Sequence, residues 1–416
     1  MAERRVAVTG MGVLTCNAIG VQAYWEACTA GRQGIGPITR FDTSDHLTHF
    51  GGEVACSTID LCDGDKRMAR RKDRFVLLAL KAAAEAIGMA GFAKDAWSDP
   101  FRVATIVSSG IGGLETIQSE HRTLINRGPH RVSPLLVPRM IPDSAAGDIS
   151  IVYGAKGPNY SSVTACATGS HCIGAGFQHI RHGDCDIAIV GGAEAPITEL
   201  GVAGFNSIKA LSTRNDDPAT ASRPFDAHRD GFVIAEGAGV LILEELEAAK
   251  ARGADILGEV VGYGCTGDAF HETQPDPTGD AGAACMEMAL RSAGITPDQV
   301  GYINAHGTST KYNDASETAI IKRVFGEQAR KMAVSSTKSM IGHTLGAAGG
   351  VEAIITLLSL KHGVLTPTIN YTTPDPDCDL DYVPNQAREQ AVQYALSNNL
   401  GFGGHNASLI FKRFDG

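Results

Sequence analysis

The chain of 416 residues is acidic, with a formal net charge of -10 at pH 7. Because nucleic acids are recognised through basic surfaces, this balance argues against nucleic acid as the main partner. With 43% hydrophobic and 20% charged residues, the composition is typical of a soluble α/β protein with a large core, in two domains or one duplicated unit.

The first apolar stretch, residues 6–8, is too short for a signal peptide, and no later apolar run approaches the length of a membrane span. We therefore expect a cytoplasmic protein that does not enter a membrane. The ten cysteines fit a reducing compartment, because none forms a C-x-x-C pair and no spacing indicates zinc. We expect neither a metal nor a cofactor.

Short β-branched strands alternate with alanine-rich helices along the chain, which is the pattern of α/β layers. Strands are expected at residues 5–9, 102–108, 186–190, 240–243 and 301–304. Helices are expected at residues 75–87, 169–181, 281–293 and 347–362.

The order of these elements repeats weakly. The run 162–166 precedes a Gly/Ala-rich helix that ends near His182, and the run 334–338 also precedes such a helix, which ends at His362. We expect two halves, residues 1–255 and 256–416. Corresponding loops of two such halves would face each other, so a site between them could draw residues from both.

Cys166 is the strongest candidate for a nucleophile. A β-favouring run stops at this residue, and a long Ala/Gly-rich helix follows. A cysteine at such a turn lies at the positive end of the helix, where the thiolate is favoured and backbone N–H groups point outward. The thiolate is the reactive form, so we predict catalysis at Cys166 and core positions for the other cysteines.

Two histidines in small-residue loops are candidate partners. His306 follows an expected strand in Asn-Ala-His-Gly-Thr, and His343 precedes an expected helix in Ile-Gly-His-Thr. Loops at strand ends commonly hold catalytic groups, although either histidine alone would more often be structural. Together with Cys166 they could donate hydrogen bonds to a thioester carbonyl, or one could serve as a general base.

Several motifs in order resemble those of the β-ketoacyl-acyl-carrier-protein synthases, in particular the elongating type of the thiolase superfamily. The resemblance extends from Arg5 to Phe411. The motifs are 164–166, 304–310, 336–339, 342–343 and 401–404, with further matches at 223–226 and 230–232.

The resemblance implies a thiolase fold, in which two similar halves form a five-layer αβαβα sandwich, within a homodimer. It implies that Cys166 accepts an acyl group from the phosphopantetheine arm of acyl carrier protein. His306 and His343 would then bind malonyl carrier protein and promote its decarboxylation. The resulting carbanion would attack the acyl thioester and give a 3-oxoacyl product and carbon dioxide.

The same resemblance implies roles for residues around the nucleophile. The backbone N–H groups of Cys166 and Phe402 would bind the tetrahedral intermediate, and the glycines beside Phe402 make it a candidate gate. Lys338 and Glu317 match residues that organise the site. The alternative for these two is an ordinary ion pair or two unrelated surface charges.

Substrate contacts are also implied. Phe205 and Ile111 match positions that line an acyl pocket, although both could be plain core residues. Thr308 and Thr310 match substrate-binding positions. A hydrophobic slot discriminates by only ~1–3 kcal/mol per methylene, so no chain length is predicted.

Residues 66–74 form the most basic stretch of the chain, just before the helix expected from residue 75. Positive charge there opposes the helix dipole, so helix stability does not explain it. The resemblance implies a docking patch for an acidic carrier protein, although a solvated turn is the alternative. The candidates for this patch are Arg67, Arg70, Arg71 and Lys209.

Other enzyme classes fit less well. Residues 262–267 match G-x-G-x-x-G, but Pro275 and Pro277 interrupt the helix that a dinucleotide site requires. A degradative thiolase would need a second cysteine near residues 402–405. A polyketide or specialised-lipid ketosynthase, or a non-catalytic chain-length-factor subunit, remains an alternative.

Overall fold

The computed structural model describes residues 4–416 and is built around one ten-stranded mixed sheet. Its strands lie in the order β10-β9-β13-β14-β8-β1-β7-β6-β5, and β2 pairs with β1. The strands are β1 (Val6–Thr15), β2 (Ala18–Ile19), β5 (Val103–Ser108), β6 (Ile187–Glu194), β7 (Gly237–Glu245), β8 (Gly258–Gly267), β9 (Val300–Asn304), β10 (Ala333–Ser335), β13 (Tyr394–Gly401) and β14 (His405–Lys412). Two small ribbons pair β3 (Gly36–Pro37) with β4 (Phe50–Gly51), and β11 (Val364–Leu365) with β12 (Arg388–Glu389).

Helices cover both faces of the sheet and fill the space between its two wings. They are α1 (Val21–Thr29), α2 (Lys66–Arg71), α3 (Arg74–Met89), α4 (Leu114–Arg127), α5 (Leu136–Met140), α6 (Ser144–Tyr153), α7 (Thr168–His182), α8 (Glu199–Ser207), α9 (Leu246–Ala251), α10 (Asp280–Ala293), α11 (Lys311–Phe325), α12 (Lys338–Ile341) and α13 (Ala348–His362). The 3-10 turns that matter for the site are η4 (Ala165–Ala167) and η8 (Leu345–Ala347).

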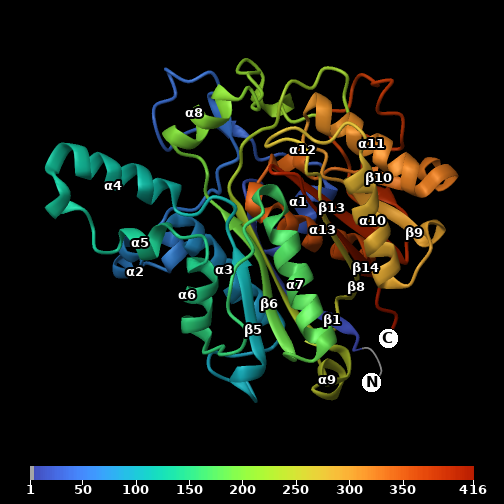
Figure 1. Cartoon of the computed structure of the whole chain (residues 1–416), viewed down its shortest axis with the longest axis horizontal. Helices are drawn as coiled ribbons and strands as arrows, with labels where there is room; N and C mark the ends of the chain where they lie inside the picture. The colour runs from blue at the N-terminus through green and yellow to red at the C-terminus, as the bar shows by residue number, and fades with distance from the viewer. Residues whose placement is uncertain (1–3) are drawn as a thin grey trace.

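The layers follow the expected five-layer αβαβα order, which confirms the predicted thiolase fold. One wing of the sheet contains β5, β6, β7 and β1, and the other contains β8, β14, β13, β9 and β10. Helices α7 and α13 pack against each other and contact strands of both wings, so they form the middle layer (Figure 1). Helices α3 and α6 cover the first wing on its outer face, and α10 covers the second with α11 beside it.

The two wings repeat one pairing pattern. In the first wing β5 and β6 are parallel, and β7 and β1 then add antiparallel. In the second wing β9 and β13 are parallel, and β14 and β8 then add antiparallel. The wings join where residues 6–8 of β1 pair with residues 258–260 of β8. The weak repeat in the sequence therefore has a counterpart in the sheet.

Strand β1 is longer than expected, because Gly10 and Gly12 lie inside it rather than ending it. A Cβ atom on Gly12 would lie 2.0 Å from the carbonyl oxygen of Ala82 in α3. These glycines therefore let a helix approach the strand closely, which is a common reason for glycine within a sheet. All ten residues of β1 are buried.

The predicted helices and the other predicted strands are confirmed to within a few residues of their ends, but the repeat is aligned differently from our expectation. Residues 334–338 form the end of β10 and the start of α12, not the turn that precedes α13. That turn is η8, and it matches η4 before α7. Within residues 4–416, no helix combines the length and the apolar character needed to cross a bilayer.

Candidate active site

Cys166, His306 and His343 converge at one point. The cysteine sulfur and one ring nitrogen of each histidine all lie within 4.8 Å of one another. The two imidazole rings are nearly perpendicular, at 86°, with their centroids 5.2 Å apart. Cys166 is 7% exposed and each histidine 2%, so the three groups meet in a water-poor space.

Cys166 occupies the turn that our sequence analysis expected. It is the middle residue of η4, directly before α7, and Ala165 precedes it in a left-handed conformation with φ of 49°. Burial raises the pKa of the Cys166 thiol to about 12, while the charge of Lys338 and the backbone N–H of Phe402 lower it. The helix N-terminus favours the thiolate as well. Burial therefore favours the protonated thiol, and Lys338 and the Phe402 N–H favour the thiolate.

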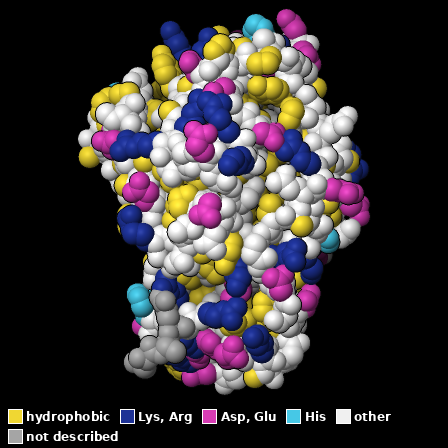
Figure 2. All heavy atoms as spheres, turned by 90° about the vertical axis from the view of Figure 1, so that its right-hand side faces the viewer, with side chains coloured by type: hydrophobic (Ala, Val, Ile, Leu, Met, Phe, Trp, Pro, Cys, Tyr) yellow, Lys and Arg dark blue, Asp and Glu magenta, His cyan; other side chains and the backbone are white. Residues whose placement is uncertain are grey.

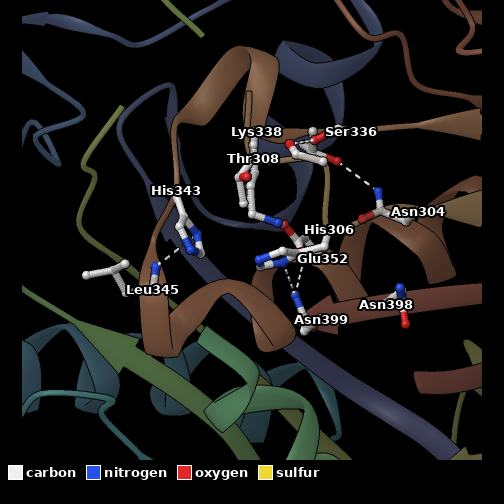
Figure 3. Close-up of polar contacts among 12 residues, drawn as sticks. Asn304, His306, Thr308, Ser336, Lys338, His343, Leu345, Glu352, Asn398 and Asn399 are labelled. Carbon is white, nitrogen blue, oxygen red and sulfur yellow. Dashed lines mark hydrogen bonds and ion pairs between the residues drawn. The ribbon is translucent and has the colours of Figure 1, made fainter. Parts of the chain in front are cut away.

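Both histidines are held as neutral hydrogen-bond donors. The backbone N–H of Leu345 donates to His343 Nδ1 at 3.4 Å, and the side-chain amide of Asn399 lies 3.5 Å from His306 Nδ1 (Figure 3). If Nδ1 accepts in each ring, the hydrogen is on Nε2. Burial lowers the pKa of both histidines well below the usual value, and the nearby Lys338 charge lowers it further.

Lys338 forms a fully buried ion pair, with Glu352 of α13 rather than with Glu317. Its Nζ donates to Glu352, whose other carboxylate oxygen accepts the Asn399 amide at 2.7 Å (Figure 3). Lys338 and Glu352 are each 1% exposed, so the surface-charge alternative for Lys338 is wrong. Ser170 of α7 donates to Asn399 at 2.5 Å, which links the network to the helix behind Cys166.

Glu317 fixes the loop that carries His306. Its carboxylate accepts the backbone N–H groups of His306 and Gly307, each at 2.8 Å, and the Asn398 amide at 2.9 Å. Burial raises the pKa of Glu317 to about 7, against the lowering effect of these hydrogen bonds. Glu317 is fully buried, so it is not a surface charge either.

A cavity of about 510 Å³ leads to the three groups. It brings together most of the residues that our sequence analysis selected. Those among its lining residues are Cys166, Phe205, Lys209, His306, Thr308, Thr310, His343 and Phe402. Ile111 belongs instead to an apolar cluster around Cys166 that also contains Phe205 and Phe232.

Phe402 lies in the turn between β13 and β14, with glycine on both sides. Gly403 and Gly404 have positive φ angles of 83° and 73°, which explains the need for glycine. The N–H of Gly403 donates to the carbonyl of Glu272 at 2.8 Å, so the turn is tied to the loop between β8 and α10. That loop supplies residues 273–276 to the cavity wall.

Thr308 and Thr310 both line the cavity, with their hydroxyl oxygens 2.9 Å apart. Asp314 of α11 holds their loop, because it accepts the Thr308 N–H at 3.0 Å and forms a buried ion pair with Arg229. Ser309, between the threonines, is left-handed with φ of 68°. A buried scaffold therefore imposes the shape of this loop.

The four predicted docking residues fall into two groups. Arg67, Arg70 and Arg71 are exposed on α2, whereas Lys209 is exposed at the cavity rim after α8. Arg74, the last residue of the basic stretch, is buried in an ion pair with Glu236 and is not available to a partner. The face on the other side of the molecule, over the C-terminal elements, shows acidic and basic side chains interspersed (Figure 2).

The glycine motif 262–267 lies inside β8 and is not a strand-to-helix turn. A Cβ atom on Gly262 would lie 2.4 Å from the carbonyl of Ala289, and one on Gly264 would lie 2.1 Å from that of Cys285. These glycines therefore serve the packing of α10 on the sheet. The motif lacks the helix N-terminus that binds a pyrophosphate.

Three buried polar residues of the site were not predicted from the sequence: Glu194, Glu352 and Asn399. A signal was available for the two glutamates, because each interrupts an apolar run: Glu194 at the end of β6 and Glu352 within α13. A charged residue is almost never fully buried unless it is paired. The donor set of one cysteine and two histidines also matches the ligand types of zinc, so the expected absence of a metal stays a prediction.

Comparisons with known proteins agree with this geometry. Residues 3–249 match the family described as the N-terminal domain of beta-ketoacyl synthase, and residues 257–372 match its C-terminal domain. A curated relative from Staphylococcus aureus (strain COL), named 3-oxoacyl-[acyl-carrier-protein] synthase 2, is 51% identical over 99% of both chains. A relative of the same name from Synechocystis sp. is 49% identical over 100% of this chain and 99% of its own.

Solved structures show the same likeness. A beta-ketoacyl synthase from Burkholderia phymatum superposes with a TM-score of 0.92 at 37% identity, over 99% of this chain and 100% of its own. A ketosynthase of a type II polyketide system, solved in complex with its acyl-carrier protein, has a TM-score of 0.92 at 35% identity over the same shares.

Proposed function

The chain belongs to the β-ketoacyl synthase family, and from this premise we propose that it elongates acyl chains held on an acyl carrier protein. It is a condensing acyltransferase, a 3-oxoacyl-[acyl-carrier-protein] synthase of fatty acid synthesis. The observation that carries the proposal is the convergence of a thiol and two neutral imidazoles within 4.8 Å at the wall of a deep cavity.

The first step of the proposed reaction loads Cys166. Its thiolate attacks the acyl thioester, a new carbon–sulfur bond forms, and the carrier thiol leaves with a proton. The oxyanion that forms in between needs fixed donors, and the backbone N–H groups of Cys166 and Phe402 are our candidates. The backbone N–H of Phe402 lowers the pKa of the Cys166 thiol, which supports this assignment.

The second step extends the chain. Malonyl carrier protein loses carbon dioxide, and the electron pair of the broken bond moves into a thioester enolate. Two Nε2–H donors, from His306 and His343, would stabilise the enolate oxygen in this water-poor site. The enolate carbon then attacks the acyl group, the bond to Cys166 breaks, and the thiolate is released beside Lys338.

The acyl chain would extend into the apolar cluster beside Cys166, which supports pocket roles for Phe205 and Ile111. The ring of Phe205 lies edge-on to that of Phe232, with centroids 5.4 Å apart, and Phe232 in turn contacts the His343 ring. Thr308 and Thr310 are our candidates for contacts with the carrier's pantetheine arm.

We propose that the carrier protein docks through the basic side chains on α2 and at Lys209. Attraction between this surface and an acidic carrier would mainly raise the association rate. Arg70→Glu should therefore raise the KM for carrier-bound substrate several-fold at low salt and less at high salt. If the KM changed neither with salt nor with this substitution, the proposed docking site would be contradicted.

We propose a homodimer through the face formed by α4, α5 and α6, which lies far from the C-terminal elements (Figure 1). Large apolar side chains are exposed there, among them Ile125 at 70%, Val137 at 56% and Ile151 at 77%. Exposed apolar side chains that gather on one face are typical of an interface. Sedimentation of wild type and Ile151→Asp tests this, because only the variant should shift toward monomer.

We propose that the protein is cytoplasmic. We also propose that it consists of two halves, residues 1–255 and residues 256–416. The repeated strand pairing supports a boundary between α9, which ends at Ala251, and β8, which begins at Gly258. Separate expression of the two halves would test this boundary. Each half alone would expose the middle-layer helix that packs against the other half in the intact chain. Co-expressed halves should therefore associate and recover activity, and failure of both to fold would count against the boundary.

The experiment that tests the function is single turnover with carrier-bound substrates. Intact mass should show one acyl group added to wild type and none to Cys166→Ala, and malonyl carrier protein should then yield a product two carbons longer. Acylation that survives in Cys166→Ala would contradict the assigned nucleophile. The polyketide and chain-length-factor alternatives are less favoured, and the second would show no acylation with any chain length.

A further inference from the structure

We propose that Glu194 is a positioning residue, whose buried carboxylate clamps the loop that carries Ile111 against the turn that follows His343, directly beside Cys166. The inference rests on the proposed function, because it assigns a task within that site. Glu194 is the last residue of β6 and is fully buried. None of the catalytic steps described above uses it.

The carboxylate binds two separate loops at once. One oxygen, Oε2, accepts the backbone N–H of Gly110 at 2.8 Å and that of Gly346 at 2.9 Å. The other, Oε1, accepts the Ser109 hydroxyl and the N–H of Ile111, the latter at 3.3 Å. Residues 109–111 follow β5, and Gly346 is the middle residue of η8.

Glycine at both contact points permits this convergence. A Cβ atom on Gly346 would lie 2.5 Å from Glu194 Oε2 and 2.3 Å from the Gly110 nitrogen. One on Gly110 would lie 2.9 Å from both Glu194 Oε2 and the carbonyl oxygen of Ala165, next to Cys166. Three loops of the site therefore meet around one carboxylate.

The surroundings of Glu194 contain hydrogen-bond donors, as an ionised carboxylate requires. The hydroxyl of Ser109 accepts the N–H of Gly112 at 2.6 Å, so it is free to donate its own hydrogen to Glu194. Burial raises the pKa of Glu194 to about 7, and these hydrogen bonds oppose that rise. Burial also raises the pKa of the Cys166 thiol, to about 12, so the Glu194 carboxyl is the stronger acid of the two.

The clamp acts on both reaction steps. It fixes the backbone of Ile111, in the apolar cluster around Cys166. It also fixes η8, whose first residue, Leu345, donates its N–H to His343 Nδ1 and so sets which ring nitrogen carries the hydrogen. A glutamate at this position thus aligns the acyl cluster with the histidine that acts in decarboxylation.

The negative charge has a cost for the nucleophile, which makes the proposal testable. The titratable and charged groups that face the Cys166 thiol are Glu194 from β6, Lys338 from α12, Glu352 from α13, and the two histidines. Of these, Glu194 and Glu352 oppose the thiolate and Lys338 favours it. Removal of the Glu194 charge should therefore make the thiol more reactive while the looser loops make turnover slower.

The experiment compares Glu194→Gln with wild type by two measurements on the full-length enzyme: the rate of Cys166 alkylation by iodoacetamide across pH, and steady-state condensation. We expect alkylation at pH 8 to be about three- to tenfold faster, because one pKa unit changes the thiolate fraction tenfold. We expect kcat to fall at least about tenfold. A loosened structure would also expose the buried Cys166 thiol to iodoacetamide, so a variant that shortens the side chain but keeps the charge is needed to separate the two effects.

Two further variants separate the charge from the clamp. Glu194→Asp keeps the charge but shortens the reach, so it should slow turnover while alkylation stays within about twofold of wild type. Ser109→Ala removes one donor, should slow turnover less than Glu194→Gln, and serves in its place if that variant does not fold. Glu115→Gln, which changes an exposed glutamate paired with Arg40, should alter neither rate.

The proposal is overturned if Glu194→Gln leaves both rates unchanged, or if both fall together in a folded protein. Alkylation needs no carrier substrate. If wild type lacked condensing activity, the proposed function would be contradicted, and the alkylation comparison would still decide whether Glu194 acts on Cys166.

Discussion

Two turn-and-helix units lie side by side in the middle layer of the molecule. The turn η4 leads into α7, and the turn η8 leads into α13. Both turns open with a left-handed residue, Ala165 with φ of 49° and Leu345 with φ of 47°. Both helices have 15 residues and end at a left-handed glycine, Gly183 or Gly363.

The difference between the units is in their side chains. The middle residue is Cys166 in η4 and Gly346 in η8. Gly346 has no room for a side chain and contributes its backbone N–H to Glu194, whereas Cys166 presents a thiol to the cavity. The C-terminal unit instead begins just after His343 and carries Glu352, the partner of Lys338. A shared backbone thus supports different chemistry, with the nucleophile on the first unit and the buried carboxylate of Glu352 on the second.

Loss of the buried Lys338–Glu352 ion pair should have the largest effect on the free energy of unfolding. Lys338→Met would leave Glu352 buried without its counter-ion, which typically costs about 3–5 kcal/mol in the free energy of unfolding. Urea denaturation measures this loss, and the double variant with Glu352→Gln should recover part of it. As a matched control, Lys322→Met breaks a partly exposed pair with Asp379 and should cost under about 1 kcal/mol. Equal losses at the two lysines would argue against a special role for the buried pair.

The division of labour itself is tested by separating the two reaction steps. His343→Ala should slow release of carbon dioxide from malonyl carrier protein by about 10²–10³-fold, the usual effect of losing one donor to a developing oxyanion. Acylation of Cys166, followed by intact mass, should continue. The exposed His121→Ala should change neither step. If His343→Ala abolished acylation as strongly as decarboxylation, the units would not be specialised in this way.

The contact between the units depends on glycine. A Cβ atom on Gly349 of α13 would lie 2.1 Å from the backbone nitrogen of Ser170 in α7. Gly349→Ala should therefore force the helices apart and lower the free energy of unfolding by about 1–3 kcal/mol. Gly88→Ala in α3, where an added Cβ meets no atom within 4 Å, should instead stabilise by about 0.5–1 kcal/mol. A neutral Gly349→Ala would mean that the middle layer has more freedom than the structure indicates.

The smallest effect concerns pH. Burial lowers the pKa of His343 in the folded protein, so the unfolded chain binds more protons once the pH falls below the ordinary value of about 6.5. This histidine should therefore cost stability on acidification, by about 1.4 kcal/mol between pH 7.5 and 5.5. His343→Asn lacks that penalty, so its stability relative to wild type should rise by this amount over the interval. The exposed His130→Asn is the control, and an equal shift there would contradict the assignment to burial.

Local patterns in the sequence were enough to locate most helices and strands, since apolar periodicity and glycine positions depend on near neighbours. They also gave the nucleophile, because a cysteine at a strand-to-helix turn is recognisable from its own segment. The partner of Lys338 was not accessible in this way. Glu352 lies 14 residues further along, and only the tertiary fold brings its carboxylate to Lys338.

The amino-acid sequence by itself determined the α/β class, the duplicated order of elements and the identity of Cys166, His306 and His343 as the groups to examine. Only the tertiary structure decided the pKa values of those groups and the hydrogen bonds that position them. Burial makes both imidazoles neutral and the thiol weakly acidic, and Glu194, Glu317 and Glu352 each collect donors from distant segments. Such tuning depends on desolvation and on contacts between loops far apart in the chain, which no local pattern encodes.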